Sequence, residues 1–171
     1  MSDPINIISL TVNGERISRG VEPRETLADF LRQALELTGT HMGCEMGVCG
    51  ACLVLVDDVV VHSCLMYAVQ AGGSKVETIE GLTARAAIAD IQDAFHERNA
   101  LQCGFCTPGM LMTAHSLLSK PGIPSRDEIR DALSGNYCRC TGYQAIVDAI
   151  ENVACRRAEA SGEVKIEQDG K

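Results

Sequence analysis

Residues 43–52 read Gly-Cys-Glu-Met-Gly-Val-Cys-Gly-Ala-Cys, and this stretch decides the fold of the chain. Its three cysteines and one further along the sequence form a set with the spacing C-x4-C-x2-C-x11-C: Cys44, Cys49, Cys52 and Cys64. This is the spacing of plant-type [2Fe–2S] ligation. Four thiolates drawn from two stretches of chain indicate a first metal site.

A second set of four cysteines follows in the other half of the chain. Its spacing is C-x2-C-x31-C-x-C, and its members are Cys103, Cys106, Cys138 and Cys140. Each pair lies just before an expected helix start, at Pro108 and at Thr141. Free N–H groups and the helix dipole favour negative charge there. The second set therefore predicts a second [2Fe–2S] site.

Glycines lie beside or between the ligands of the first set: Gly43, Gly47 and Gly50. Glycine has no Cβ and tolerates positive φ, so its backbone can wrap closely around a cluster. Backbone N–H groups directed at sulfur tune the potential of such a centre. We expect these glycines to shape the cluster loop.

Two other roles for the cysteines remain as alternatives. A disulfide framework needs an even cysteine count and a secretory context, whereas this chain has nine cysteines and begins without an apolar leader. Structural zinc sites usually use two short C-x2-C pairs, and neither set has two. Iron–sulfur chemistry is favoured, and Cys155 is left over as a small packing residue.

Composition excludes several classes of function. The net charge is −8 and only 4% of residues are aromatic, which argues against a nucleic-acid-binding surface. No stretch is long and apolar enough to predict membrane insertion. Abundant free thiols are typical of a reducing compartment, so we expect a cytoplasmic location.

The first half of the chain predicts a small α+β unit. Alternating apolar residues on either side of Asn13-Gly14 predict a hairpin over residues 7–21. Apolar periodicity predicts a helix over residues 26–37. A second hairpin is expected with arms 53–56 and 59–62, followed by a strand at 75–79.

The second half reads as helical. Periodic apolar residues and end signals predict four helices, of which the third begins with the capping box Ser125-x-x-Glu128 and the last is capped by Thr141. We therefore expect three segments: a ferredoxin-like domain over residues 1–81, a helical cluster-binding domain over 82–155, and a mobile tail over 156–171.

With both cysteine sets placed, the chain resembles a known family. It is similar to the small iron–sulfur subunit of molybdenum hydroxylases, the xanthine oxidase, aldehyde oxidoreductase and carbon monoxide dehydrogenase family. The resemblance covers about residues 7–154, and its matching segments are residues 11–14, 43–52, 63–64, 102–110 and 135–143. It implies an N-terminal β-grasp domain followed by a C-terminal four-helix bundle.

The resemblance also implies a function. The chain would relay single electrons from a molybdopterin-type molybdenum cofactor on a large partner subunit, through two [2Fe–2S] clusters, to FAD on a medium subunit or to an external acceptor. By the same resemblance, Gln102 and Cys140 would lie near the pterin. The substrate of the whole oxidoreductase would be an N-heteroaromatic compound, with aldehydes, purines and carbon monoxide as less favoured classes.

Two alternative functions remain open from the sequence. One is a free-standing two-cluster ferredoxin with no fixed partner, and the other is a zinc-binding assembly module. The sequence shows no Ser–His–Asp set, phosphate-binding loop or dinucleotide fingerprint. We therefore expect no catalytic residue and no substrate site on this chain.

Overall fold

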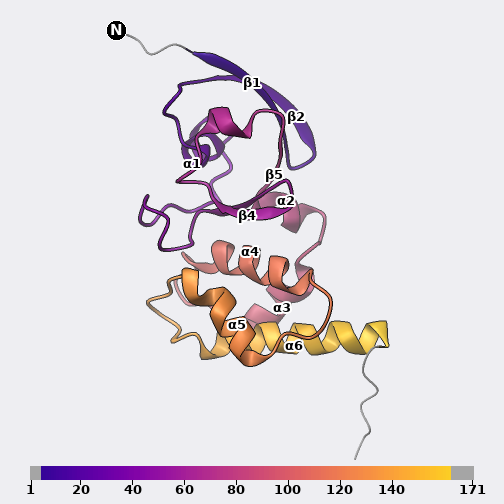
Figure 1. The fold of residues 1–171 in the computed structure, drawn as a ribbon. Coiled ribbons are helices and arrows are strands. Elements are labelled where there is room, and N and C mark those ends of the chain that lie inside the picture. The colour runs from indigo at the N-terminus through magenta and orange to yellow at the C-terminus, as the bar shows by residue number, and fades with distance from the viewer. Residues whose placement is uncertain (1–4, 163–171) are drawn as a thin grey trace, which may run out of the picture.

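The computed structural model describes residues 5–162, and the ends of the chain, 1–4 and 163–171, lie outside the described residues. A strand-rich half and a helical half are stacked on each other, with the sheet in the upper part of Figure 1 and the longest helix at the base. This is the α+β architecture that the sequence predicts.

The sheet forms as expected from two hairpins and one further strand. Its order is β2-β1-β5-β3-β4, and β1 pairs with β5 in parallel. The strands are β1 (Asn6–Val12), β2 (Glu15–Val21), β3 (Leu53–Val56), β4 (Val59–His62) and β5 (Lys75–Glu77). Both hairpin turns have positive φ at two successive residues, 51° and 87° at Asn13-Gly14 and 49° and 65° at Asp57-Asp58. Such turns match the twist of the strands they join.

The helix expected over residues 26–37 is shorter and partly irregular. Thr26 caps it, since its hydroxyl accepts from the Asp29 N–H at 3.0 Å. After α1 (Leu27–Asp29) the chain forms a π-helix, η1 (Phe30–Ala34), and at Glu36 φ is 58°. The prediction of a regular helix to residue 37 was wrong because the backbone hydrogen bonds change from the α-helical to the π-helical pattern after α1.

The helical half contains the four expected helices and a fifth, short one. They are α2 (Ile79–Ala84), α3 (Ala89–Glu97), α4 (Thr107–Leu118), α5 (Arg126–Ala132) and α6 (Gln144–Ser161). Short 3-10 turns occur at η2 (Ala68–Ala71) and η3 (Leu133–Gly135). The strand expected to reach Ile79 ends at Glu77, because Ile79 is already the first residue of α2. The expected domain boundary at residue 81 falls inside α2, and a division at that position stays a prediction.

The start and end of α6 differ from expectation. Thr141 does not cap this helix, since the residue at its N-terminal boundary is Tyr143, in the left-handed region with φ 68°. At the other end α6 continues to Ser161, so residues 156–161 of the expected mobile tail are helical. The remainder of that tail, apart from Gly162, lies outside the described residues.

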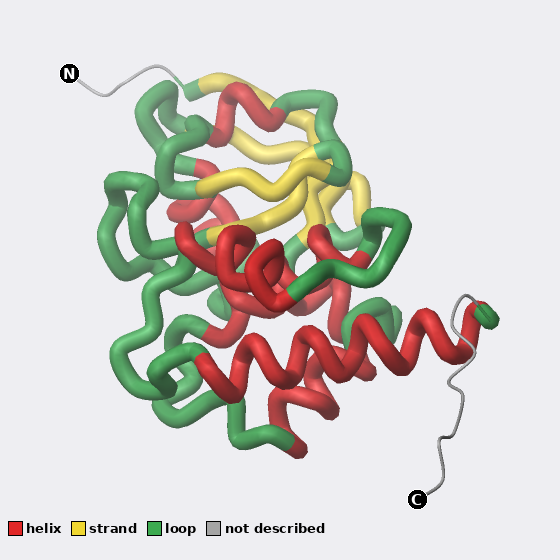
Figure 2. The backbone as a smooth tube through the Cα atoms, turned by 60° about the horizontal axis from the view of Figure 1, so that its bottom comes forward, coloured by secondary structure: helices red, strands yellow, loops and turns green. Residues whose placement is uncertain are grey.

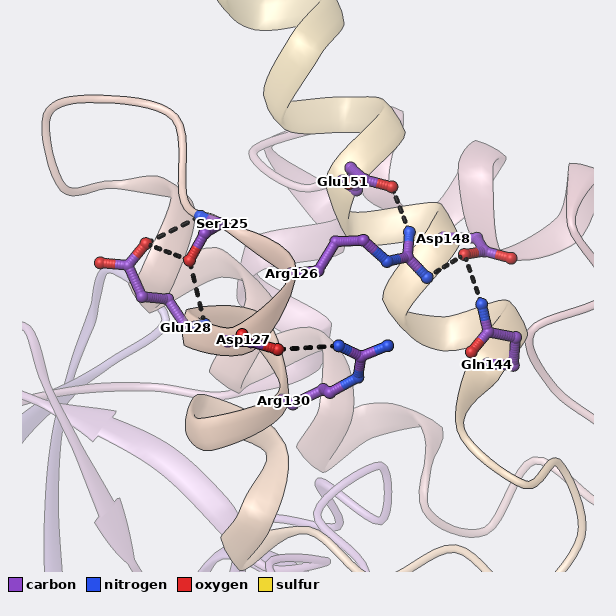
Figure 3. A network of polar contacts seen from close by, with 8 residues as sticks. All are labelled: Ser125, Arg126, Asp127, Glu128, Arg130, Gln144, Asp148 and Glu151. Carbon is purple, nitrogen blue, oxygen red and sulfur yellow. Dashed lines mark hydrogen bonds and ion pairs between the residues drawn. The ribbon is translucent and has the colours of Figure 1, made fainter.

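Ion pairs join α5 to α6, and a capping box forms the start of α5, as Figure 3 shows. The Ser125 hydroxyl accepts from the Glu128 N–H at 3.3 Å, and the Glu128 carboxylate accepts from the Ser125 N–H at 2.7 Å. Arg126 pairs with Asp148 at 2.6 Å and also with Glu151. The predicted capping box is therefore present, and the residue that follows it ties α5 to α6.

Strand β3 belongs to both hydrophobic cores. Leu53 and Leu55 pack into the helical core with residues of α3, α4 and α6. Val54 and Val56 pack into a second core, which the sheet forms with α1 and η1. All four side chains are buried. Figure 2 shows the resulting order, with the yellow strands directly over the red helices. Strand β3 therefore lies between the two cores and connects the two halves.

Candidate metal centres

The first four cysteines gather at the loop between η1 and β3 and at the end of β4. Cys44 and Cys49 interact directly, as do Cys52 and Cys64. The Cys44 and Cys64 thiols are also close enough to interact electrostatically. Cys52 and Cys64 are buried, whereas Cys44 and Cys49 are half-buried. The loop thus brings the four thiols together as two pairs.

The second four cysteines form two pairs as well. Cys140 Sγ lies 3.6 Å from Cys103 Sγ, and Cys106 interacts directly with Cys138. The outer pair, Cys103 and Cys140, is exposed. The inner pair, Cys106 and Cys138, is half-buried. Cys106 is the residue immediately before α4. Cys138 and Cys140 do not lie at a helix N-terminus as the sequence suggested. They precede a turn, because α6 starts only at Gln144.

Backbone N–H groups point at the thiols of the first set. The Met46 N–H donates to Cys44 Sγ at 3.5 Å, and the N–H groups of Gly43 and Gly47 donate to Cys49 and Cys64. Gly47 has φ of 75°, and a Cβ there would collide with Leu65. Glycine suits this position because it adopts this φ without strain, and the turn directs the backbone toward sulfur.

Within each set the thiol pKa values are driven apart. Hydrogen bonding from the Met46 backbone N–H lowers the pKa of Cys44 to about 6, whereas burial raises the pKa of Cys64 to about 12. Burial also raises the pKa of Cys106 to about 12. Burial would raise the pKa of Cys138 too, but hydrogen bonds from Thr141 outweigh it and the net shift is downward. A bound cation would favour the thiolate throughout.

The pairing of the thiols suits a two-iron cluster. Across residues 5–162, no three His, Cys, Asp or Glu side chains converge on a point that a single metal ion could occupy. A [2Fe–2S] cluster takes four cysteines divided between two irons, whereas structural zinc needs four ligands around one centre. The donor set of each site therefore fits a [2Fe–2S] cluster.

Gln102 lies at the exposed pair of the second set. Its side-chain Nε2 donates to the Cys140 carbonyl at 3.0 Å, and both residues are exposed. Gln102 and Cys140, which the resemblance places near a pterin, therefore lie side by side in the fold. Contact of either residue with a pterin stays a prediction.

Several residues that shape the two sites were not predicted from the sequence. The His41 ring stacks on Phe105 with centroids 4.7 Å apart, and its Nδ1–H donates to the Phe105 carbonyl at 2.8 Å. Tyr143 and Asn136 hold the segment before Cys138. Both lie in the conspicuous stretch at residues 135–143, but only the fold reveals what they contact.

Comparisons with known proteins match both halves of the chain. Residues 10–82 match the 2Fe-2S iron-sulfur cluster binding domain, and residues 78–151 match the [2Fe-2S] binding domain. The chain thus has two [2Fe–2S] clusters. Within residues 5–162, no helix combines the length and the apolar character needed to span a bilayer.

Similar proteins are subunits of oxidoreductases. The caffeine dehydrogenase subunit gamma of Pseudomonas sp. (strain CBB1) is 53% identical over 152 residues, covering 87% of this chain and 91% of the relative. The nicotine 6-hydroxylase small subunit of Paenarthrobacter nicotinovorans is 51% identical over 143 residues, covering 84% and 86%. Among solved structures, quinoline 2-oxidoreductase from Pseudomonas putida 86 superimposes with a TM-score of 0.83 at 49% identity, covering 94% of this chain and 99% of that one.

Proposed function

The chain belongs to the family of small [2Fe–2S] subunits of molybdenum hydroxylases, and on this premise we propose that it relays single electrons between a partner's molybdenum cofactor and an acceptor. A large subunit with that cofactor is its partner in the oxidoreductase complex. The observation that carries the proposal is the presence of two sets of four thiols in one chain, of which one pair, Cys103 and Cys140, is exposed for a partner.

We assign the ligands by set. The ferredoxin-like half would hold its cluster with Cys44, Cys49, Cys52 and Cys64, and the helical half with Cys103, Cys106, Cys138 and Cys140. The pairing of the thiols supports this assignment. When bound, each cluster supplies a one-electron carrier. The protein holds these carriers in place and shields the inner sulfur atoms from water.

The exposed pair is the proposed entry point for electrons. Gln102 fixes the backbone at Cys140, so that the carbonyl and thiol of Cys140 are presented at the surface. A pterin docked there would meet one cluster ligand and one amide side chain. The first cluster lies in the other half of the molecule and would pass the electron onward, to FAD on a medium subunit or to an external acceptor.

The substrate of the complex is proposed to be an N-heteroaromatic compound. The relatives named for caffeine, nicotine and quinoline support this class, because they match most of the chain at about half identity or more. An aldehyde is the second class, since the aldehyde oxidoreductase of Desulfovibrio gigas is 36% identical with a TM-score of 0.80. We also propose a cytoplasmic location, which suits a chain with nine cysteines.

Purification of the native complex tests the proposal. We expect about four irons and four acid-labile sulfides per chain, the content of two [2Fe–2S] centres, with molybdenum on a co-purifying large chain. Caffeine, nicotine, nicotinate and quinoline, with benzaldehyde for comparison, would be tested for reduction of the clusters. A soluble monomer without molybdenum would point instead to a free-standing ferredoxin, and a colourless zinc protein would end the electron-transfer proposal.

A further inference from the structure

A backbone hydrogen bond joins the ligand loops of the two sites. The Tyr137 backbone N–H donates to the Cys49 carbonyl at 2.9 Å. Cys49 belongs to the first cysteine set, and Tyr137 is the neighbour of Cys138 in the second. The covalent chain from one set of thiols to the other is therefore interrupted only by this hydrogen bond.

The segment that makes this bond is held from several sides. The buried Asn136 side chain donates to the Gly50 carbonyl at 3.4 Å and accepts from the Thr113 hydroxyl at 2.8 Å. The Tyr143 hydroxyl accepts from the Cys138 N–H at 2.8 Å and donates to the Asn136 carbonyl at 3.0 Å. The bridging amide is thus fixed at its own residue and at both of its neighbours.

Glycines let the two backbones touch. Gly109, in the first turn of α4, lies so close to the Gly50 carbonyl that any Cβ at Gly109 would collide with it. A Cβ at Gly50 would come within 2.5 Å of the Gly135 carbonyl oxygen and 2.6 Å of the Asn136 amide nitrogen. Since α4 follows Cys106 directly, these contacts fix how near the second site lies to the first.

We propose that Cys138, the Tyr137 amide and Cys49 form the electron path between the two clusters, with Gly50 and Gly109 as positioning residues that set its length. This rests on the proposed function of electron relay. One electron passes at a time, so that the centre held by Cys138 is oxidised by one electron and the centre held by Cys49 is reduced by one. No covalent bond forms or breaks and no proton need move.

A competing connection makes the proposal specific. Phe105 lies between Cys103 and Cys106, and its stacking with His41 links the same two loops. This link combines the ring contact with the hydrogen bond from His41 to the Phe105 carbonyl, but its residues lie outside the cysteine sets, and His41 is three residues from Cys44. The path through Cys49 and Tyr137 is continuous from ligand to ligand, and for this reason we favour it.

Replacement of the bridging amide is the direct test. Tyr137→Pro and Tyr137→Ala both remove the ring, but only proline removes the N–H. Asn136 has φ −115° and ψ 114°, an extended conformation that a following proline tolerates. In the complete complex, photogenerated deazaflavin radical would supply single electrons, and rapid freeze-quench EPR would follow their redistribution between the two cluster signals. We expect several-fold slower redistribution in the proline variant than in the alanine variant.

Equal rates in the two variants, with both cluster signals intact, would overturn the proposal. If the proline variant does not retain both clusters, Gly109→Ala decides. It should slow redistribution, whereas Gly135→Ala, where an added Cβ meets nothing within 4 Å, should not. A Gly109→Ala variant with the wild-type rate would also overturn the proposal, as would slow transfer in Phe105→Leu alone. Because deazaflavin replaces substrate, these outcomes are independent of whether molybdenum is the natural electron source.

Discussion

The Tyr143 hydroxyl accepts a hydrogen bond from the backbone N–H of Cys138 at 2.8 Å. The same hydroxyl donates to the Asn136 carbonyl at 3.0 Å, so one side chain closes the loop that carries a proposed ligand. The Tyr143 backbone is left-handed, with φ 68°, just before α6 begins. A non-glycine residue held in this region marks a position that the surrounding structure determines strongly.

Removal of this hydroxyl should disturb one cluster and spare the other. In Tyr143→Phe the Cys138 N–H and the Asn136 carbonyl lose their partner, which should cost about 1–3 kcal/mol in the free energy of unfolding. We expect a changed EPR line shape for the helical-domain cluster and an unchanged signal for the ferredoxin-like cluster. Tyr67→Phe, at an exposed ring, is the control. An identical pair of spectra in Tyr143→Phe would argue against a structural role for the hydroxyl.

Replacement of Cys106 tests the ligand assignment. A serine there removes a half-buried thiol of the inner pair. Cys106→Ser should abolish the helical-domain EPR signal and stop turnover with natural acceptors, while the ferredoxin-like signal and its share of the iron remain. Cys155→Ser changes an exposed cysteine outside both sets and should leave iron content and turnover unchanged. Turnover that survives Cys106→Ser would show that electrons take another route.

Local signals predicted much of the fold. The hairpin turn requires two left-handed residues, and the Asn13-Gly14 pair, which readily adopts that conformation, therefore predicts it. Ser125 with Glu128 predicts the start of α5. The cysteine spacings predicted two separate groups of thiols, and the structure gathers the same eight residues. In each case the information lies within a few residues of the feature.

Features that depend on distant partners could not be predicted. The close approach of Gly109 to Gly50 joins residues far apart in sequence, and nothing near Gly109 shows it. Likewise, the chain forms a π-helix after Asp29, with Phe30 and Leu31 buried, and an ideal periodic pattern does not contain this change of hydrogen bonding. The sequence therefore predicts which cysteines form each group, but not which contacts connect the two groups.

The contribution of β3 to both cores predicts that the two halves unfold together. Leu55 is 4% exposed and packs into the helical core although it belongs to the sheet. Leu55→Ala should therefore lower the free energy of unfolding by about 2–5 kcal/mol. Circular dichroism and loss of visible cluster absorption should follow the same shifted denaturant curve. Two separate transitions, with only the helical half destabilised, would contradict coupling of the two cores through β3.

The carboxylate of Glu77 gives a pH dependence with a definite sign. Its side chain is 4% exposed and pairs with Arg85 and, at 3.4 Å, with Lys75. The hydrogen bond from Arg85 holds the pKa of Glu77 below its ordinary value, although burial opposes this. A lowered pKa in the folded state contributes stability above the unfolded pKa, and that stability is lost as the pH falls through the folded pKa.

Comparison of Glu77→Gln with the wild type measures this contribution. At pH 7 the variant should be less stable by about 1–3 kcal/mol, because Arg85 and Lys75 lose their charged partner. The deficit should stay constant down to about pH 5 and shrink below the unfolded glutamate pKa of about 4.3, where the wild type begins to lose the same charge. Glu97→Gln, in the exposed pair with Arg156, should cost no more than about 1 kcal/mol. A deficit for Glu77→Gln that widens on acidification would reverse the sign and refute the assignment.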